Sequence, residues 1–224
     1  MQLSYITIRG GVYIMSNYYI LMADIIKSKE RKSDKLIINF KNLTSDINLQ
    51  YKTSFLSPST ITLGDEFQAI VRSLKNSVEV IIAFEEKIIQ EKHDFKLRYV
   101  LHYGTIDTPI NRNFAYGMLG PGLSEARDRL EILKNQSHRF FFSLGNKLLE
   151  DKMNFAFILY QSFVDSWKAD NFPLVTEFLK EEDYKKVAKK LKKDKSLMWR
   201  RKKTLKINEY MAAKNMILLQ AEST

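Results

Sequence analysis

The chain has 224 residues, of which 45% are hydrophobic and 12% aromatic, so it can bury a sizeable core and is not a disordered polypeptide. It has no cysteine, which excludes disulfides and thiolate zinc sites. No signal peptide is recognisable, and together these features favour the cytoplasm. No uncharged apolar stretch approaches the roughly 18–20 residues that cross a bilayer, so we expect no membrane span.

The net charge of +10 is concentrated near the C-terminus. Residues 181–206 hold twelve Lys or Arg and four Asp or Glu, a net of +8. A segment of this kind is either a solvated helix face or a binding surface for an acidic partner.

Residues 1–14 fit poorly with the pattern that follows them. Arg9-Gly10-Gly11-Val12 lies shortly before Met15, and purine-rich codons there would be a translated ribosome-binding site. We therefore predict that the natural protein starts at Met15.

The segment 18–103 predicts a sheet with two helices. An apolar strand over 18–23 precedes a loop over 25–29 and a helix over 34–48 with apolar residues at helical spacing. Strands over 59–63 and 67–71 flank a tight turn and predict a hairpin. A helix over 74–90 and a strand over 97–103 follow. This βαββαβ order predicts an α+β, ferredoxin-like sheet with both helices on one face.

The second half predicts a smaller helical region. A glycine-rich loop over 118–122 precedes a helix over 124–133 and a strand over 139–144, and an apolar helix over 155–167 follows. We predict three parts, namely an α+β domain over 15–150, a connecting helix over 151–170 and a small all-α domain over 171–224.

Two acidic residues lie at the ends of neighbouring predicted strands. Asp24 follows the first strand and Asp65 lies in the hairpin turn, so both are expected at one end of the sheet. Two carboxylates suffice for Mg²⁺ or Mn²⁺, because such ions keep water and phosphate oxygens as further ligands. Glu66 is a candidate third ligand. The alternative is that all three are ordinary turn residues.

A nucleotide is the ligand that such a metal site favours. Backbone amides from Ile25 to Ser28 and around Gly117, Gly120 and Gly122 are candidates for binding phosphate oxygens. The helix that follows the glycine loop would help through its N-terminus.

Three motifs resemble class III nucleotidyl cyclases in order and spacing. They are Met22-Ala23-Asp24-Ile25-Ile26, Leu63-Gly64-Asp65-Glu66-Phe67 and Leu97-Arg98-Tyr99-Val100-Leu101-His102-Tyr103-Gly104. The turn also resembles diguanylate cyclases. The stretches 23–28, 60–68 and 117–122, with 126–130, are similar to the SatD-like family over most of 17–215. The cyclase resemblance implies a cyclase-type fold in which Asp24 and Asp65 bind metal ions.

The chain departs from the cyclase pattern at the residues that recognise the base and at those that stabilise the transition state. Thr60-Ile61-Thr62 replaces a lysine that reads the base, Ser124 takes the asparagine position, and Asp128 takes the arginine position. Arg127 and Arg129 are candidate substitutes that bind nucleotide, although each faces about a hundred degrees away from Asp128 on a helix.

The basic segment predicts a helix-turn-helix. Helices over 184–191 and 197–205 flank a short turn, with Ser196 as the N-cap. The second helix would enter the DNA major groove. Its candidate DNA-binding residues are Ser196 at its start, Arg200 and Arg201 for contacts to guanine, and Lys202 and Lys203 for phosphates. The alternative is a basic helical hairpin packed on the first domain. Helix-turn-helix and cyclase domains both pair, which predicts a homodimer.

Together these features favour a cytoplasmic DNA-binding transcriptional regulator with a cyclase-like sensor domain for a nucleotide and Mg²⁺. One alternative is an active nucleotidyl cyclase or another metal-dependent nucleotidyl-transfer enzyme. A third interpretation is an interaction module that has lost the activity of its site.

Overall fold

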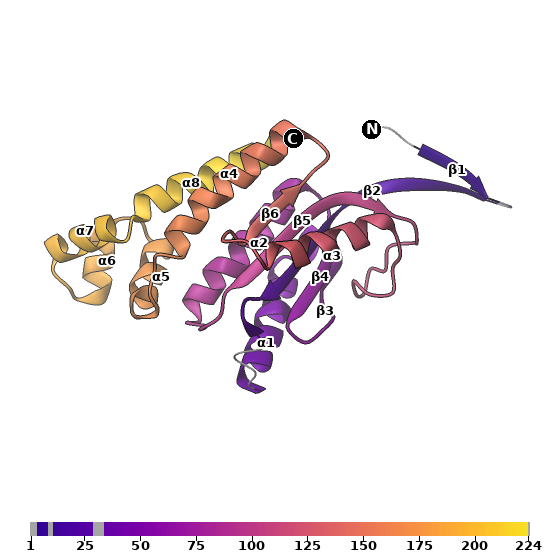
Figure 1. Cartoon of the computed structure of the whole chain (residues 1–224). Coiled ribbons are helices and arrows are strands. Elements are labelled where there is room, and N and C mark those ends of the chain that lie inside the picture. Colours follow the sequence, from indigo (N-terminus) through magenta and orange to yellow (C-terminus); the bar gives the residue numbers. More distant parts are fainter. Residues whose placement is uncertain (1–3, 9–10, 29–33, 224) are drawn as a thin grey trace.

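A single mixed sheet organises the molecule, as the computed structural model shows (Figure 1). The structure describes residues 4–8, 11–28 and 34–223. The strand order is β3-β4-β2-β5-β6, antiparallel throughout except for the parallel pair β5–β6. The strands are β1 (Ser4–Ile8), β2 (Gly11–Ile25), β3 (Phe55–Ile61), β4 (Glu66–Val71), β5 (Leu97–Ile106) and β6 (Phe140–Ser143).

The two faces of the sheet are covered by different helices. Leu21 and Ala23 of β2 belong to the core under α1 (Asp34–Gln50), α2 (Leu74–Gln90) and α4 (Lys147–Val164). Ile20 and Met22 belong to a second core under α3 (Pro121–Leu133). Successive side chains of a strand point to opposite faces, which explains this division. The predicted α+β sheet, with its first two helices on one face, is confirmed.

The hairpin differs from its prediction at both strands. β3 begins at Phe55 instead of residue 59, although it contains Pro58. Proline is tolerated there because β3 is an edge strand whose register with β4 shifts twice. Glu66, predicted in the turn, is the first residue of β4.

The first part of β2 extends beyond the sheet. Residues 11–15 of β2 pair with β1 alone, whereas pairing with β5 begins at Ser16 (Figure 1). The proposed start at Met15 stays a prediction.

The C-terminal region is entirely helical. It contains α5 (Phe172–Lys180), α6 (Tyr184–Leu191), α7 (Lys195–Thr204) and α8 (Ile207–Glu222), while short 3₁₀ turns cover Lys52–Ser54 and Ala169–Asn171. Neither α5 nor α8 is predicted by the local sequence pattern. α8 lies alongside α4 (Figure 1), where the Tyr210 ring contacts those of Tyr160 and Trp167. One continuous apolar core thus joins the sheet to these helices, and the predicted domain boundaries stay predictions.

In the part of the chain that the structure describes, every helix is too short or too polar to cross a lipid bilayer.

Candidate functional site

Sheet pairing brings the predicted carboxylates to one end of the sheet. Asp24 of β2 lies opposite Glu66 on β4 and opposite Arg98 on β5. The backbone N–H of Ile25 donates to the carbonyl of Asp65 at 2.9 Å, which places the hairpin turn beside the end of β2. Asp24 has the same strand parity as the β2 side chains that pack under α3, so its carboxylate faces that helix.

The Asp24 carboxylate is buried and only partly balanced by cations. Its residue is 5% exposed, and Arg98 donates from Nη1 to both carboxylate oxygens at 2.8 Å. Lys134 Nζ lies 3.8 Å from one of these oxygens. Burial raises the pKa of Asp24 to about 6, although Arg98 and Lys134 act to lower it, and Glu66 adds to the increase. Stronger positive charge at this position would therefore be favourable.

The other two acidic residues have partners of their own. Glu66 accepts hydrogen bonds from Arg127 Nη2 at 2.7 Å and from the Thr62 hydroxyl at 3.2 Å. Asp65 accepts a hydrogen bond from the Ser28 hydroxyl. Glu66 is thus paired with an arginine, as Asp24 is, and its role as a third metal ligand stays a prediction.

The donor set fits a hard divalent cation that the protein binds with few ligands. Throughout the described ranges, no three His, Cys, Asp or Glu side chains form a group that could hold a metal ion alone. Asp24 and Asp65 supply two carboxylates at one end of the sheet, and Mg²⁺ or Mn²⁺ takes its remaining ligands from water and phosphate. The chemistry of the donor set, two carboxylate residues from adjoining ends of β2 and the β3–β4 turn, supports this fit.

The predicted phosphate-binding amides are used differently. The amide of Ile25 donates to Asp65 and that of Ile26 to the carbonyl of Lys96, so both stabilise the sheet end. Ser28 contributes its hydroxyl to Asp65. The structure therefore gives this loop a role in holding the hairpin turn beside β2.

The glycines of the loop before α3 differ in their surroundings. A Cβ atom on Gly122 would lie 2.7 Å from the backbone of Gly104, and one on Gly120 would lie 2.7 Å from Ile106 Cα. These two glycines let the start of α3 approach β5 closely. Gly117, by contrast, has a φ of +74° and open space around it.

A cavity lies between the β3–β4 turn and the start of α3, and Asp24, Asp65 and Glu66 are not among its lining residues. Its volume is about 510 Å³, and Thr62, Gln68, Tyr116, Gly117 and Arg127 are among the residues that line it. Because Arg127 both lines this cavity and binds Glu66, the cavity and the Asp24 site are neighbours.

Two of the three cations around the carboxylates were missed in the sequence. Arg129, predicted to bind nucleotide, lies over the Phe141 ring at 5.6 Å instead. Arg98 and Lys134 were not predicted, yet both contact Asp24. A signal for Arg98 was present, since it interrupts the apolar strand over 97–101. Lys134 follows the last turn of α3, and no local pattern identifies it.

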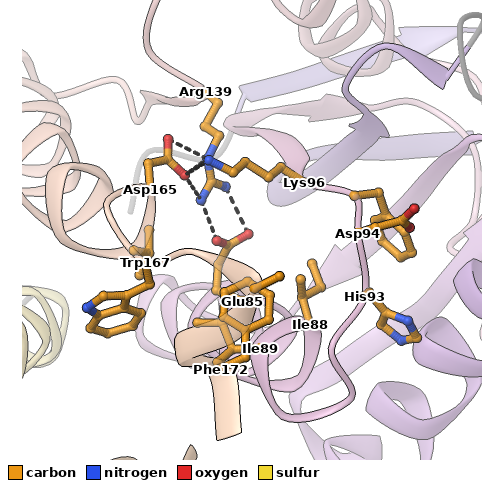
Figure 2. Close-up of a pocket in the computed structure, with 13 residues that line it drawn as sticks. Glu85, Ile88, Ile89, His93, Asp94, Lys96, Arg139, Asp165, Trp167 and Phe172 are labelled. Carbon is orange, nitrogen blue, oxygen red and sulfur yellow. Dashed lines mark hydrogen bonds and ion pairs between the residues drawn. The ribbon is translucent and has the colours of Figure 1, made fainter. Parts of the chain in front are cut away.

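A second buried arginine lies among the helices of the opposite face (Figure 2). Arg139 binds both carboxylate oxygens of Glu85 on α2, as well as Asp165 after α4 and the carbonyl of Leu97. Lys96 also reaches Asp165, at 2.9 Å. Glu85, Arg139 and Asp165 line a cavity of about 240 Å³ with Trp167 and Phe172. This cluster ties α2, β5, β6 and α4 together.

The basic helices are held by contacts within the chain. Arg201 donates to Asn171, and Lys202 donates to the carbonyl of Glu182 at 2.6 Å. Lys203 lies over the Trp199 ring at 3.9 Å, while Arg200 lines a shallow hollow with Trp199. The predicted cap is wrong, because Asp194 and not Ser196 accepts the amide of Leu197 and α7 begins at Lys195.

Comparison with known families gives a match over nearly the whole chain. Residues 18–219 match the SatD family. The chain belongs to the SatD family. No curated protein matches this SatD-family chain.

Several solved nucleotidyl cyclases are similar to this SatD-family protein. A bacterial light-regulated adenylyl cyclase has 13% identity and a TM-score of 0.45, over 57% of this chain and 43% of that chain. The adenylyl cyclase CyaB from P. aeruginosa has 17% identity and a TM-score of 0.38, over 53% and 72%. A monomeric guanylyl cyclase domain of the RhoGC fusion protein from the aquatic fungus Blastocladiella emersonii has 16% identity and a TM-score of 0.38, over 58% of this chain and 83% of that chain. The chain thus spans less than half of the first of these proteins.

The interpretation as a DNA-binding transcriptional regulator is wrong. The side chains predicted to contact DNA at Arg201 and Lys202 bind residues 171 and 182 of the same chain. The basic segment is therefore a set of packed helices, in line with the alternative of a basic helical hairpin.

Proposed function

We propose that this SatD-family protein binds a nucleoside triphosphate with a divalent cation at Asp24 and Asp65 and catalyses nucleotidyl transfer. The observation that carries the proposal is the position of Asp24, which is buried at the end of β2 where the backbone of the next residue bonds to Asp65, and whose neighbour Glu66 binds an arginine that lines a cavity of about 510 Å³. Three cations lie at this end of the sheet and suit a polyphosphate, namely Arg98 on β5, Arg127 on α3 and Lys134 just after α3.

The residues have separate tasks in this reaction. Asp24 and Asp65 would hold Mg²⁺ or Mn²⁺, which polarises the phosphoryl group and neutralises its charge when bound. Arg127 and Lys134 would bind the β- and γ-phosphates. The cavity would hold the nucleoside against polar groups such as Thr62 and Gln68.

The transfer itself needs no co-reactant beyond the acceptor hydroxyl. The hydroxyl oxygen attacks the α-phosphorus, the bond from that phosphorus to the bridging oxygen breaks, and pyrophosphate leaves with the bond's electron pair. The hydroxyl proton passes to water. If the acceptor is the ribose 3′-hydroxyl of the same nucleotide, the product is cyclic. Ser124 and Asp128 stand where cyclases have asparagine and arginine, so stabilisation would come from Arg127 or Lys134.

A turnover assay with single substitutions tests the proposal. Purified protein is incubated with each nucleoside triphosphate and Mg²⁺ or Mn²⁺, and pyrophosphate and nucleotide products are measured. We expect pyrophosphate release that Asp24→Asn and Asp65→Asn each reduce at least about a hundredfold. Asp151→Asn is the matched control, because Asp151 pairs with exposed Lys147 on α4. Absence of both metal-dependent binding and turnover with all four nucleotides would refute the proposal.

A homodimer belongs to the same proposal. Leu63, Phe114, Tyr116 and Leu119 are exposed apolar side chains from the β3–β4 turn and the loop before α3, on the side of the cavity. A second copy would cover them. Sedimentation velocity measures the mass in solution. A monomer at all concentrations, with and without nucleotide, would contradict this assembly.

A further inference from the structure

The guanidinium of Arg98 is only partly used in the structure. Both of its hydrogen bonds leave from Nη1 and end on Asp24. Among the residues that the structure describes, Nε and Nη2 of Arg98 have no hydrogen-bond partner. The side chain is 10% exposed, and Nε and Nη2 are not among the fully buried atoms that lack a partner, so these donors are at the accessible edge of the side chain. Arg98 therefore depends on Asp24 for its charge partner and keeps donors for a second anion.

Arg98 also occupies the place of the metal ion that the proposed function requires. Its Nη1 lies 2.8 Å from both Asp24 oxygens, so Arg98 competes with a divalent cation for the position between those oxygens. Removing Asp24 from Arg98 without replacement leaves a buried, unpaired guanidinium, which is strongly unfavourable. The cost falls if another anion binds the freed donors.

We propose that Arg98 is an internal counter-ion that couples metal binding at Asp24 to polyphosphate binding, an inference that rests on the function proposed above. A divalent cation displaces Arg98 from Asp24, and the polyphosphate of the nucleotide becomes its new partner. Either ligand alone binds weakly. The metal alone leaves the Arg98 guanidinium without an anionic partner, and the polyphosphate alone must compete with Asp24 for that guanidinium. Both together bind tightly, and the coupling is reciprocal.

Lys134 contributes to the same exchange from the other side. Its Nζ lies 3.8 Å from Asp24, and it also contacts Glu131 on α3. Its side chain is 37% exposed, so it can turn to another anion without a large desolvation cost. Lys134 therefore opposes the metal less strongly than Arg98.

Binding of Mn²⁺ alone gives the first test. Free Mn²⁺ is titrated by electron paramagnetic resonance against the full chain and its variants. Arg98→Met should bind Mn²⁺ about tenfold more tightly than the wild type, because the competing cation is gone. Lys134→Met should change in the same direction by a smaller factor, and it tests the idea even if Arg98→Met folds poorly. Arg72→Met is the matched control, since Arg72 lies at the other end of β4 and binds the carbonyl of Thr53.

Inorganic tripolyphosphate gives the second test. In the wild type, saturating Mn²⁺ should strengthen tripolyphosphate binding about tenfold or more, measured by calorimetry at fixed free Mn²⁺. In Arg98→Met this enhancement should disappear. If Arg98→Met and Lys134→Met retain wild-type Mn²⁺ affinity and wild-type coupling, the inference is overturned while the proposed function stands. If the wild type binds neither probe, or Asp24→Asn binds both unchanged, the proposed metal site itself fails.

Discussion

The two buried arginines of the sheet differ in how completely they are paired. Arg139 uses all three guanidinium nitrogens, which donate to Glu85 and Asp165 (Figure 2) and to the carbonyl of Leu97. Arg98 uses one nitrogen and one carboxylate. The electrostatic consequence is opposite. The pKa of Asp165 is lowered, because Arg139 and Lys96 outweigh its burial, whereas burial of Asp24 outweighs its cations and raises the pKa.

This difference separates a structural cluster from a site that can accept a ligand. A buried pair with every donor and acceptor used joins elements rigidly and has nothing to offer. A buried carboxylate with incomplete compensation can gain free energy from a cation. Perturbed and partly satisfied groups of this kind are the ones that functional sites contain.

Arg139→Met should have the largest effect on stability. It leaves Glu85 buried without its charge partner and removes the bonds between α2, β6 and the end of α4. We expect a loss of about 3–5 kcal/mol in the free energy of unfolding, measured by urea denaturation. Arg72→Met, at an exposed hydrogen bond, should change it by about 0.5 kcal/mol or less. Equal losses in the two variants would break the comparison.

The pH dependence of stability should reveal Asp24 next. Its pKa is about 6 in the folded protein, against an ordinary value of 3.8 in an unfolded chain, so the native state binds more protons between these values. Stability from this group is therefore fully present below about pH 4 and falls by up to about 3 kcal/mol as pH rises through 6. Urea titrations from pH 4 to 8 should show this slope in the wild type but not in Asp24→Asn. Parallel curves would show that Asp24 is already balanced.

Arg98→Met should destabilise the protein less than Arg139→Met. Asp24 becomes unpaired, but its pKa near 6 means that it can take up a proton cheaply at neutral pH. We expect a loss of about 1–2 kcal/mol at pH 7 and a smaller loss at pH 5. Chemical denaturation at the two pH values measures it. A loss as large as that of Arg139→Met at both would mean that Arg98 is structural.

The outer lysines should show the smallest effects. Lys96 is 49% exposed beside Asp165, and Lys134 is 37% exposed beside Asp24. Each substitution to Met should cost less than about 1 kcal/mol, since exposed ion pairs contribute little. Thermal unfolding at low and high salt checks this. A loss above about 2 kcal/mol for either lysine would place it in the buried part of its cluster.

Local patterns in the sequence were sufficient for the sheet and for the acidic pair. Alternation and helical spacing predicted the order βαββαβ, and a carboxylate at a strand end beside one in a hairpin turn predicted their proximity. Prediction of the C-terminal region failed because its basic charge suggested a DNA-binding surface, whereas α5 and α8 are defined by packing against α2 and α4. Which residues of α8 are buried can be predicted only when the positions of α2 and α4 are known, because α8 packs against both helices.

The sequence by itself determined which residues carry charge, that Asp24 lies at the end of a strand and that Asp65 lies in a hairpin turn. Only the tertiary structure decided the partners of those charges, because Arg98 and Lys134 are distant from Asp24 in the sequence and meet it through cross-strand register and the end of α3. The same holds for Arg139, whose partners come from α2 and the end of α4. Strand register and helix packing depend on long-range contacts. They give Arg139 a partner for every guanidinium nitrogen, whereas Arg98 donates from Nη1 alone.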